Sequence, residues 1–325
     1  MRVVPADLAA VCRRMRAEAS AALAVHENPD TDALGAAAGM LDLFAQLGIE
    51  ARLHVAEGVS LPLEEYLLPP GSVERGLPDA GASLYALDCG SRARVALALD
   101  DWEGFVVNID HHRDNSGFGD LVLLRTEASS TCEMVCELAR ALELVPGASA
   151  ATALYAGMSF DSGHFRHSNT GAQTFSCAAW LRGLGVDVTA VYERLYEQRS
   201  REALLLWARA VASAEPKAEG RVLLATVTLR DYAATGASEE DAEGIVETLR
   251  SVAGVEVAAV VKEQSAGTRV RVSMRSDALD VSAVAALVGG GGHRLAAGFS
   301  NDDSPEEVAA WLSSELAKRL SMESC

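Results

Sequence analysis

Three short apolar segments in the first half of the chain run into aspartate or histidine residues, and this pattern constrains the fold most. They are AALAVHE, SLYALDCG and GFVVNIDHH, at residues 21–27, 83–90 and 104–112. Apolar runs of this length, bounded by turn residues, are typical of buried strands. Residues 31–48 and 129–144 have alanine and leucine at helical spacing. Alternating strands and helices predict an α/β domain built on a doubly wound, mainly parallel sheet.

The second half of the chain predicts a smaller α/β domain. Its expected strands are residues 221–229, 255–263 and 268–276, and its expected helices are residues 237–254 and 304–320. Ser238 and Asp241 are spaced as a capping box that would open the first of these helices. We therefore expect a first domain at 1–186, a helical linker at 187–214 and a second domain at 215–325.

The charge of the chain limits its partners. The formal net charge is −18, and the sequence contains only Lys217, Lys262 and Lys318 as lysines. Proteins that hold long nucleic acids neutralise many phosphates with basic side chains. The composition therefore disfavours long duplex nucleic acid as a partner and favours a small anionic substrate.

The sequence also predicts a cytoplasmic protein without membrane partners. The longest uncharged stretch, Leu144 to Phe160, is too short and too interrupted by Pro146 and Gly147 to span a bilayer. No apolar segment typical of a signal peptide follows the N-terminal arginines. Cys132 and Cys136 lie at helical spacing and are expected to be buried thiols.

Acidic and histidine residues gather where the predicted strands end. Four expected loops supply His26, Asp30 and Asp32; then Asp88; then Asp110, His111 and His112; and lastly Asp161 from residues 156–165. A single aspartate at a strand end is most often a turn former or a helix cap. Because ligands bind at the carboxyl ends of strands in open α/β sheets, the four loops together predict one crevice.

Crowding of Asp30, Asp32, Asp88 and Asp161 requires a counter-charge, because neighbouring carboxylates raise each other's pKa values. Two divalent cations would cancel the four negative charges. Carboxylate and imidazole ligands without thiolate suit Mn²⁺, with Mg²⁺ or Co²⁺ as alternatives, better than structural zinc. We therefore predict a two-metal site for phosphoryl chemistry, in which the ions activate a bridging water. His112 is placed to contact a phosphate oxygen.

The second domain offers groups that could hold the substrate's phosphates. Consecutive glycines let backbone N–H groups approach an anion closely, and an arginine can bind a phosphate with two hydrogen bonds. The predicted substrate-binding residues are Ser273, Arg275, Gly290, Gly291, Gly292 and His293. The alternative interpretation of the glycine run is a flexible helix terminus.

Over nearly its whole length the sequence resembles the DHH phosphoesterase superfamily, named for an Asp-His-His triplet like that of residues 110–112. HENPDTDALG, ALDCG, NIDHH and MSFDSGHFRHSNT resemble four family motifs in the family's order. GGGGHRLAAG is similar to the signature of the DHH-associated C-terminal domain. RTEASSTCEMV resembles a nanoRNase segment, although Ser129 to Thr131 could serve only as the cap of a helix.

The resemblance implies a specific role for each of the site residues. His26, Asp30 and Asp88 would hold one metal ion. The second ion would be held by Asp32, Asp88, His111 and Asp161, so that Asp88 bridges the two ions. Of the predicted catalytic residues, Asp110 would orient a ligand from behind and His112 would face the phosphate.

The size and domain order resemble the subgroup of nanoRNases, 3′-phosphoadenosine 5′-phosphate phosphatases and cyclic-dinucleotide phosphodiesterases. The resemblance implies an Mn²⁺-dependent hydrolase of very short oligonucleotides, dinucleotides such as pApA, or nucleoside bisphosphates, with its active site in the interdomain cleft. A cyclic-di-AMP phosphodiesterase is the alternative, and a homodimer is compatible with the sequence.

Three further alternatives share parts of this pattern. A RecJ-type exonuclease usually carries extra nucleic-acid-binding modules, for which an acidic chain of 325 residues leaves little room. A family II inorganic pyrophosphatase uses a different C-terminal domain. A phosphonucleotide sensor without activity would be expected to have lost metal ligands, and all six ligand positions are kept here.

Overall fold

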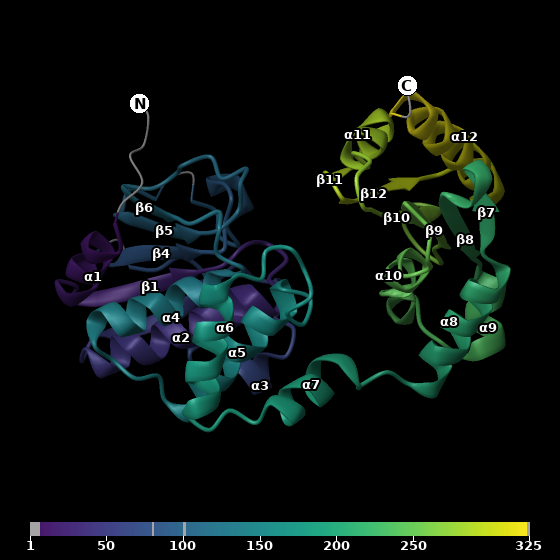
Figure 1. Cartoon of the computed structure of the whole chain (residues 1–325). Helices are drawn as coiled ribbons and strands as arrows, with labels where there is room; N and C mark the ends of the chain where they lie inside the picture. Colours follow the sequence, from purple (N-terminus) through teal and green to yellow (C-terminus); the bar gives the residue numbers. More distant parts are fainter. Residues whose placement is uncertain (1–6, 80, 100–101, 324–325) are drawn as a thin grey trace. The chain divides into compact units, whose positions relative to one another are not determined.

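The computed structural model describes residues 7–79, 81–99 and 102–323, except for the side chains of His293 and Glu323 (Figure 1). The chain divides into two compact units, Met1–Glu197 and Gln198–Cys325, each with its own sheet and core. The expected α/β class is confirmed. The segment predicted as a linker forms two helices, of which α7 (Val188–Tyr196) belongs to the first unit and α8 (Arg201–Ser213) to the second.

The first unit is built on a six-stranded sheet in the order β3-β2-β1-β4-β5-β6. Its strands are β1 (Ser20–Ala24), β2 (Glu50–Val55), β3 (Val73–Arg75), β4 (Ser83–Leu87), β5 (Val106–Asp110) and β6 (Leu121–Leu124). Every neighbouring pair is parallel, which confirms the predicted sheet type. The strand order reverses between β1 and β4, and ligand sites of open α/β sheets lie at the carboxyl ends of the strands at such a point.

The helices of the first unit gather on one face of this sheet (Figure 1). Besides α7 they are α1 (Leu8–Arg16), α2 (Thr31–Gln46), α3 (Glu64–Leu67), α4 (Thr131–Leu142), α5 (Ala148–Asp161) and α6 (Ala172–Gly183). Glycines let α2, α4 and α5 pack tightly: a Cβ on Gly35 would lie 2.5 Å from the Ala153 oxygen, and one on Gly157 would lie 2.4 Å from Cys132 Sγ. This close packing brings the first turn of α2 next to the last turn of α5.

The chain that follows β4 covers the opposite face of the sheet. Its apolar side chains, including Leu97 and Trp102, pack against Ala22 and Ala24 of β1. This segment begins with the short 3-10 helix η1 (Arg92–Arg94). Val95, directly after η1, forms an isolated antiparallel bridge with His26, so this chain segment runs along the end of β1.

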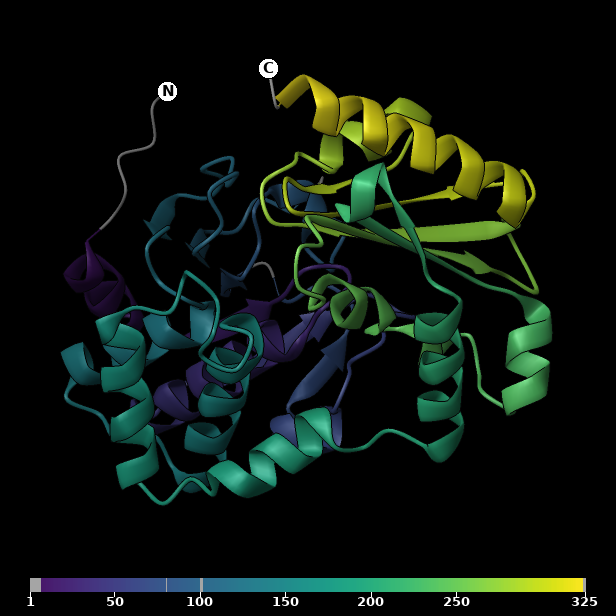
Figure 2. The same ribbon diagram turned by 45° about the vertical axis from the view of Figure 1, so that its right-hand side comes forward.

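The second unit is built on a mixed six-stranded sheet in the order β11-β12-β10-β9-β8-β7. Its strands are β7 (Glu215–Lys217), β8 (Val222–Val227), β9 (Val257–Glu263), β10 (Val270–Ser276), β11 (Gly291–His293) and β12 (Ala296–Asn301). Helices α8, α9 (Leu229–Thr235) and α10 (Ile245–Arg250) pack on one face. Helices α11 (Ser282–Ala285) and α12 (Pro305–Glu323) cover the other face (Figure 2).

Residues 237–254 do not form the single helix that the sequence predicts. The capping box is present, since Asp241 Oδ2 accepts hydrogen bonds from the Ser238 backbone N–H at 2.8 Å and its hydroxyl at 2.9 Å. It opens only the 3-10 turn η3 (Glu240–Ala242). Gly244 follows with a left-handed φ of 91°, which a continuous right-handed helix cannot contain, so α10 begins after it.

The expected state of two cysteines is confirmed. Cys132 and Cys136 lie on α4 as buried free thiols, and burial raises the pKa of both well above the usual range. Among the helices of the described residues, none is long and apolar enough to cross a membrane.

Candidate metal centre

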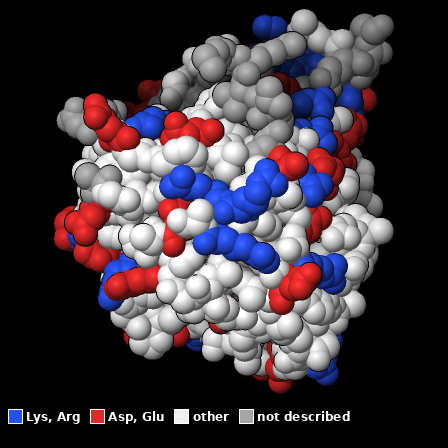
Figure 3. Space-filling model, turned by 90° about the vertical axis from the view of Figure 1, so that its left-hand side faces the viewer, with Lys and Arg blue, Asp and Glu red and all other residues white. Residues whose placement is uncertain are grey.

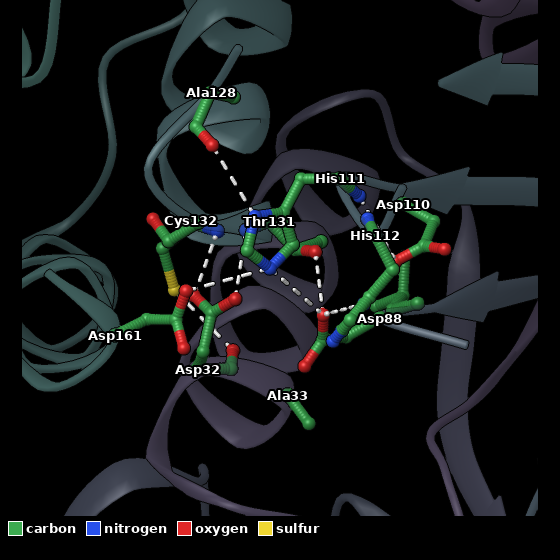
Figure 4. Close-up of polar contacts among 12 residues, drawn as sticks. Asp32, Ala33, Asp88, Asp110, His111, His112, Ala128, Thr131, Cys132 and Asp161 are labelled. Carbon is green, nitrogen blue, oxygen red and sulfur yellow. Dashed lines mark hydrogen bonds and ion pairs between the residues drawn. The ribbon is translucent and has the colours of Figure 1, made fainter. Parts of the chain in front are cut away.

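The predicted ligands of the first unit come together at the carboxyl edge of its sheet, beside the point where the strand order reverses (Figure 4). His26 follows β1, Asp88 follows β4, and Asp110 is the last residue of β5. Asp88 has a left-handed φ of 58°, which is uncommon outside glycine and occurs preferentially at functional sites.

The sequence predicted that Asp32 and Asp161 lie in loops, but the structure places both in helices. Asp32 is in the first turn of α2, and Asp161 is the last residue of α5. The uncharged run before Asp161 forms the largely buried helix α5 and not a strand that ends in a loop. Asp30 caps α2, because its Oδ1 accepts hydrogen bonds from the N–H groups of Asp32 at 2.9 Å and Ala33 at 3.1 Å.

Three imidazole–carboxylate pairs in this cluster have separations that suit shared cations better than hydrogen bonds. His26 Nε2 lies 3.7 Å from Asp88 Oδ2, and His111 Nε2 lies 3.6 Å from Asp88 Oδ1 and 3.4 Å from Asp161 Oδ2. Hydrogen bonds between such groups measure about 2.7–3.2 Å. Two ligand atoms, each about 2.1 Å from one ion, are roughly 3.0–3.4 Å apart. The observed separations lie at or just above that range, so the residues fit divalent ions.

Among the described residues, three groups of side chains have ligand atoms within 4.8 Å of one another. They are His26, Asp30 and Asp88; Asp32, His111 and Asp161; and Asp88, His111 and His112. The carboxylate of Asp88 lies between the first two groups, with Oδ2 toward His26 and Oδ1 toward His111. The first two groups contain the residues that the resemblance assigns to separate ions, and that assignment stays a prediction.

The carboxylates at the centre are held in an environment that disfavours their charge. Burial, with Asp32 and Asp30 nearby, raises the pKa of Asp88 to about 8. Burial and the neighbouring Asp161 raise the pKa of Asp32 to about 6. Burial also raises the pKa of Asp161 to about 6, although His111 opposes the shift. A divalent cation would remove this penalty by pairing with the charged forms.

The histidines that face these carboxylates are suited to metal ligation. Burial lowers the pKa of His26, which favours the neutral imidazole that a metal requires. Its Nδ1 is buried and has no hydrogen-bond partner among the described residues. His111 places Nδ1 3.2 Å from the Ala128 carbonyl oxygen, which turns Nε2 toward Asp88 and Asp161. Such a carbonyl contact is the usual second interaction of a metal-bound histidine.

His112 and Asp110 form a tight pair beside Asp88, with His112 Nδ1 3.5 Å from Asp88 Oδ1. His112 Nδ1 donates a hydrogen bond to Asp110 Oδ1 at 2.8 Å, and this bond raises the pKa of His112 to about 9. Burial would raise the pKa of Asp110, but hydrogen bonds from His112 and Asn115 hold it below its usual value. His112 is therefore a cation at neutral pH, which suits a contact with an anion.

The sequence did not predict the roles of Thr131 and Cys132 at the start of α4. Their backbone N–H groups donate to Asp32, at 2.7 Å to Oδ2 and 3.0 Å to Oδ1. The Thr131 hydroxyl also donates to Asp88 Oδ1 at 3.0 Å, whereas Ser130 caps the helix. Thr131 thus does more than cap, and the only signal in the sequence is its place in a segment that resembles nanoRNases.

Asn115 was also missed. Its Nδ2 donates to Asp110 Oδ2 and, at 2.9 Å, to the side-chain oxygen of buried Asn108. The signal in the sequence was a polar amide side chain shortly after the Asp-His-His triplet.

In the second unit, several of the predicted substrate-binding residues surround one cavity of about 540 Å³. Ser273 and Arg275 of β10 line it together with Gly291 and Gly292. Arg275 forms an ion pair of 2.8 Å with Glu247 of α10. Arg271, two residues before Ser273 on the same strand, lines the cavity as well and was not predicted.

The remaining two predicted residues of this unit differ. Gly290 does not line the cavity; a Cβ there would lie 2.4 Å from the Gly298 oxygen, so its place is a packing contact with β12. The side chain of His293 is outside the described part of the structure, and its backbone belongs to β11. Gly289, the first glycine of the run, caps the 3-10 turn Ala286–Val288, and Gly291 begins β11, so the run combines a helix terminus with a strand.

Comparison with known proteins places this geometry in a family. The model described as the N-terminal domain of the DHH family matches residues 21–158, and the DHHA1 domain matches residues 219–321. The chain is 33% identical over 305 residues to the bifunctional oligoribonuclease and PAP phosphatase NrnA of Thermus thermophilus, covering 91% of this chain and 90% of that protein. The chain belongs to the DHH family.

Two further relatives are named for different activities. The bifunctional oligoribonuclease and PAP phosphatase NrnA of Bacillus subtilis is 26% identical over 279 residues, which cover 85% of this chain and 87% of that protein. The cyclic-di-AMP phosphodiesterase PdeA of Listeria monocytogenes is 28% identical over 295 residues. That match covers 82% of this chain but only 42% of PdeA.

Solved structures support the fold assignment. An exopolyphosphatase-related protein from Bacteroides fragilis has a TM-score of 0.84 at 20% identity, covering 95% of this chain and 94% of that one. The exonuclease RecJ bound to manganese has a TM-score of 0.54 at 16% identity, covering 98% and 96%. At these identities the likeness concerns the fold alone.

Proposed function

We propose that this DHH-family chain is a metal-dependent phosphoesterase of the nanoRNase type. It would hydrolyse very short oligonucleotides and linear dinucleotides such as pApA to 5′-mononucleotides, and remove the 3′-phosphate of 3′-phosphoadenosine 5′-phosphate. The observation that carries the proposal is the Asp88 carboxylate, which presents one oxygen to each of two ligand groups. The substrate class follows the relatives named as oligoribonuclease and PAP phosphatase.

The metal ions proposed for this centre are two Mn²⁺, with Mg²⁺ or Co²⁺ as alternatives. Ions at such a shared carboxylate supply a nucleophile from water and offset the charge that develops on the phosphoryl oxygens. His26, Asp30 and Asp88 would hold one ion. The second would be held by Asp32, Asp88, His111 and Asp161.

The chain's other residues position these ligands and the substrate. Thr131 and Cys132 fix the carboxylate of Asp32 through backbone N–H groups, and the Thr131 hydroxyl fixes Asp88. Asp110 keeps His112 protonated, so that His112 can donate a hydrogen bond to a phosphoryl oxygen. Both Asp110 and His112 act without changing their own charge at neutral pH.

The second unit would bind the non-reacting part of the substrate. We propose contacts from Ser273, Arg275, Gly291, Gly292 and His293, with Gly290 shaping the loop. The surface charge supports a short substrate over a long one. The formal net charge is −18, and on the face drawn in Figure 3 the lysine and arginine side chains form bands near the middle with aspartate and glutamate around them.

A substrate panel tests the proposal. Purified chain with Mn²⁺ is incubated with pApA, cyclic di-AMP, 3′-phosphoadenosine 5′-phosphate and RNA from 2-mer to 24-mer. We expect rapid release of mononucleotides from pApA and the shortest RNAs and a steep decline with length. Degradation of 20-mers as fast as dinucleotides would contradict the short-substrate proposal and favour an exonuclease of the RecJ kind.

A cyclic-dinucleotide phosphodiesterase is the second candidate. It is favoured by the similarity to PdeA, which extends over 82% of this chain. In the same panel, faster turnover of cyclic di-AMP than of pApA would select it. A homodimer and a cytoplasmic location complete the proposal, and light scattering of the purified chain tests the first of these.

A further inference from the structure

Arg94 is a cationic residue beside the metal-ligand cluster. Its side chain is not one of the predicted metal ligands and has no evident structural role. Arg94 is the last residue of η1, and its carbonyl oxygen accepts a hydrogen bond from the Glu27 N–H at 2.8 Å. The next residue, Val95, bridges to His26. The backbone of Arg94 is therefore fixed against a predicted metal ligand. Within the part of the chain that the structure describes, its guanidinium makes no hydrogen bond or ion pair.

Arg92, a neighbouring arginine in the same segment, has a structural role that Arg94 lacks. Arg92, at the start of η1, donates from Nη2 to the Leu99 carbonyl oxygen at 2.7 Å and to the Trp102 carbonyl oxygen at 2.9 Å. These hydrogen bonds connect two parts of the segment that covers the sheet, and so stabilise its conformation. Arg94 has no such bonds although it is half-buried, so packing alone does not account for a charged side chain there.

The guanidinium of Arg94 and the Cβ of His112 both lie beside Gly90. A Cβ placed on Gly90 would lie 3.9 Å from Arg94 Nη1, 4.0 Å from His112 Cβ and 3.8 Å from Asp114 Oδ1. These side chains thus surround one spot that Gly90 leaves open.

The charge balance of the centre requires another cation to offset the negative charge of the substrate. Two divalent ions would offset the four carboxylates of Asp30, Asp32, Asp88 and Asp161. The phosphoryl group brings negative charge of its own, and His112 can meet only part of it. Guanidinium groups bind phosphoryl oxygens with two parallel hydrogen bonds, which a lysine cannot reproduce.

We infer that Arg94, together with His112, binds the phosphoryl group undergoing hydrolysis. The inference rests on the proposed phosphoesterase function. It assigns the first unit an arginine contact with the substrate, in addition to those proposed for the second unit.

The test compares Arg94→Gln and Arg94→Lys with the unchanged full-length chain, using Mn²⁺ with pApA and with bis-p-nitrophenyl phosphate. The second substrate is a phosphodiester without nucleobases or terminal phosphates. A charge-assisted contact of this type corresponds to about a 10- to 150-fold loss of kcat/KM. We expect Arg94→Gln to lose this much on both substrates, and Arg94→Lys to recover part of the loss.

Two controls separate this role from structural damage. Arg52→Gln removes the same charge from β2, where Arg52 is bonded to the Gly71 carbonyl oxygen at 2.9 Å, and should leave both rates unchanged. Calorimetric titration with Mn²⁺ alone should show that Arg94→Gln binds the ion as tightly as the unchanged chain, because Arg94 repels rather than holds it.

Each outcome is decisive. Loss on pApA without loss on bis-p-nitrophenyl phosphate would overturn the inference, because Arg94 would then act on a part of the substrate remote from the reaction. Loss of Mn²⁺ binding, or full activity in Arg94→Gln, would overturn it as well. Failure of the unchanged chain to hydrolyse any phosphoester would instead contradict the proposed function.

Discussion

The two units present different kinds of polar site. In the first unit, carboxylates and imidazoles crowd together at the carboxyl edge of a parallel sheet, and Asp32, Asp88 and Asp110 are nearly or fully buried. In the second, a cavity is lined by glycine backbone and by Ser273 and Arg275 on an antiparallel strand. The first site has an excess of negative charge that requires cations, whereas the second offers hydrogen-bond donors.

The two sites also differ in how firmly their side chains are held in place. Asp30 and Asp32 are fixed by helix N-termini, Asp88 by a strand end and Asp110 by its hydrogen bonds to His112 and Asn115. In the second unit Arg275 is held by a partly exposed ion pair with Glu247 and by a hydrogen bond from its Nη1 to the Met274 carbonyl oxygen at 3.0 Å. Exposed ion pairs are worth little and exchange readily. We therefore expect substitutions in the first unit to abolish chemistry and those in the second to shift substrate affinity.

The largest expected effect comes from Asp88→Asn. The amide keeps the shape of the side chain but removes the charge shared by both ligand groups. We expect kcat on pApA to fall at least about 1,000-fold, since metal ions supply several kcal/mol of transition-state stabilisation. Asp79→Asn, at an exposed aspartate of the same unit, should retain full activity. Activity of Asp88→Asn within tenfold of the unchanged chain would refute the shared-ligand role.

A smaller effect is expected from Asp110→Asn, which removes the partner that holds the proton on His112. The raised pKa of about 9 should then fall toward the ordinary value near 6.5. We expect a 10- to 100-fold loss at neutral pH, roughly the size found for groups that orient metal-site residues. The loss should grow between about pH 6 and 8, as His112 becomes neutral in the variant but not in the unchanged chain. A pH-independent ratio of kcat/KM values would contradict this role.

Metal binding should stabilise the first unit in a pH-dependent way. Burial raises the pKa values of Asp88, Asp32 and Asp161 to about 8, 6 and 6, above their unfolded values. Without metal, the folded state then binds more protons than the unfolded state, so stability falls as the pH rises from about 4 to 8. Saturating Mn²⁺ should raise the thermal midpoint by about 5–10 °C at pH 8 and by less at pH 6. Equal shifts at both pH values would contradict the raised carboxylate pKa values.

The smallest effects separate packing from binding within the glycine run of the second unit. Gly290→Ala would place a Cβ against β12 and should lower the free energy of unfolding by about 1–3 kcal/mol. Gly291→Ala, whose Cβ would meet nothing within 4 Å, should leave stability unchanged but raise KM for pApA if backbone N–H groups approach the phosphate. An unchanged KM for Gly291→Ala would remove this glycine from the substrate site.

The type and order of the main elements could be predicted because apolar periodicity and strand-end aspartates report directly on a parallel sheet. The short edge strands β3 and β6 and the break at Gly244 could not, since three- and four-residue strands carry little pattern and one glycine has several uses. Among the ligands, residue type indicated a metal site. That Asp161 ends a helix depends on the tight packing of α2 against α5, which no local pattern encodes.

The supporting residues were harder to predict than the ligands. Thr131 and Asn115 act on ligands distant in the sequence, and threonine and asparagine occur at many turns and caps. Arg94 was hidden for a different reason. Its segment contains two arginines that are close to Asp88 in the sequence. Arg92 makes hydrogen bonds to two carbonyl oxygens, whereas the guanidinium of Arg94 has no partner among the described residues. Only these contacts distinguish the two arginines.

The central claim is that the first unit holds two divalent ions at a shared carboxylate. Calorimetric titration of the metal-stripped chain with Mn²⁺, checked by elemental analysis of the saturated protein, tests it most directly. Two ions per chain, with the loss of at least one in Asp88→Asn, is the predicted result. A single ion per chain, or two ions that Asp88→Asn retains with unchanged affinity, would contradict it.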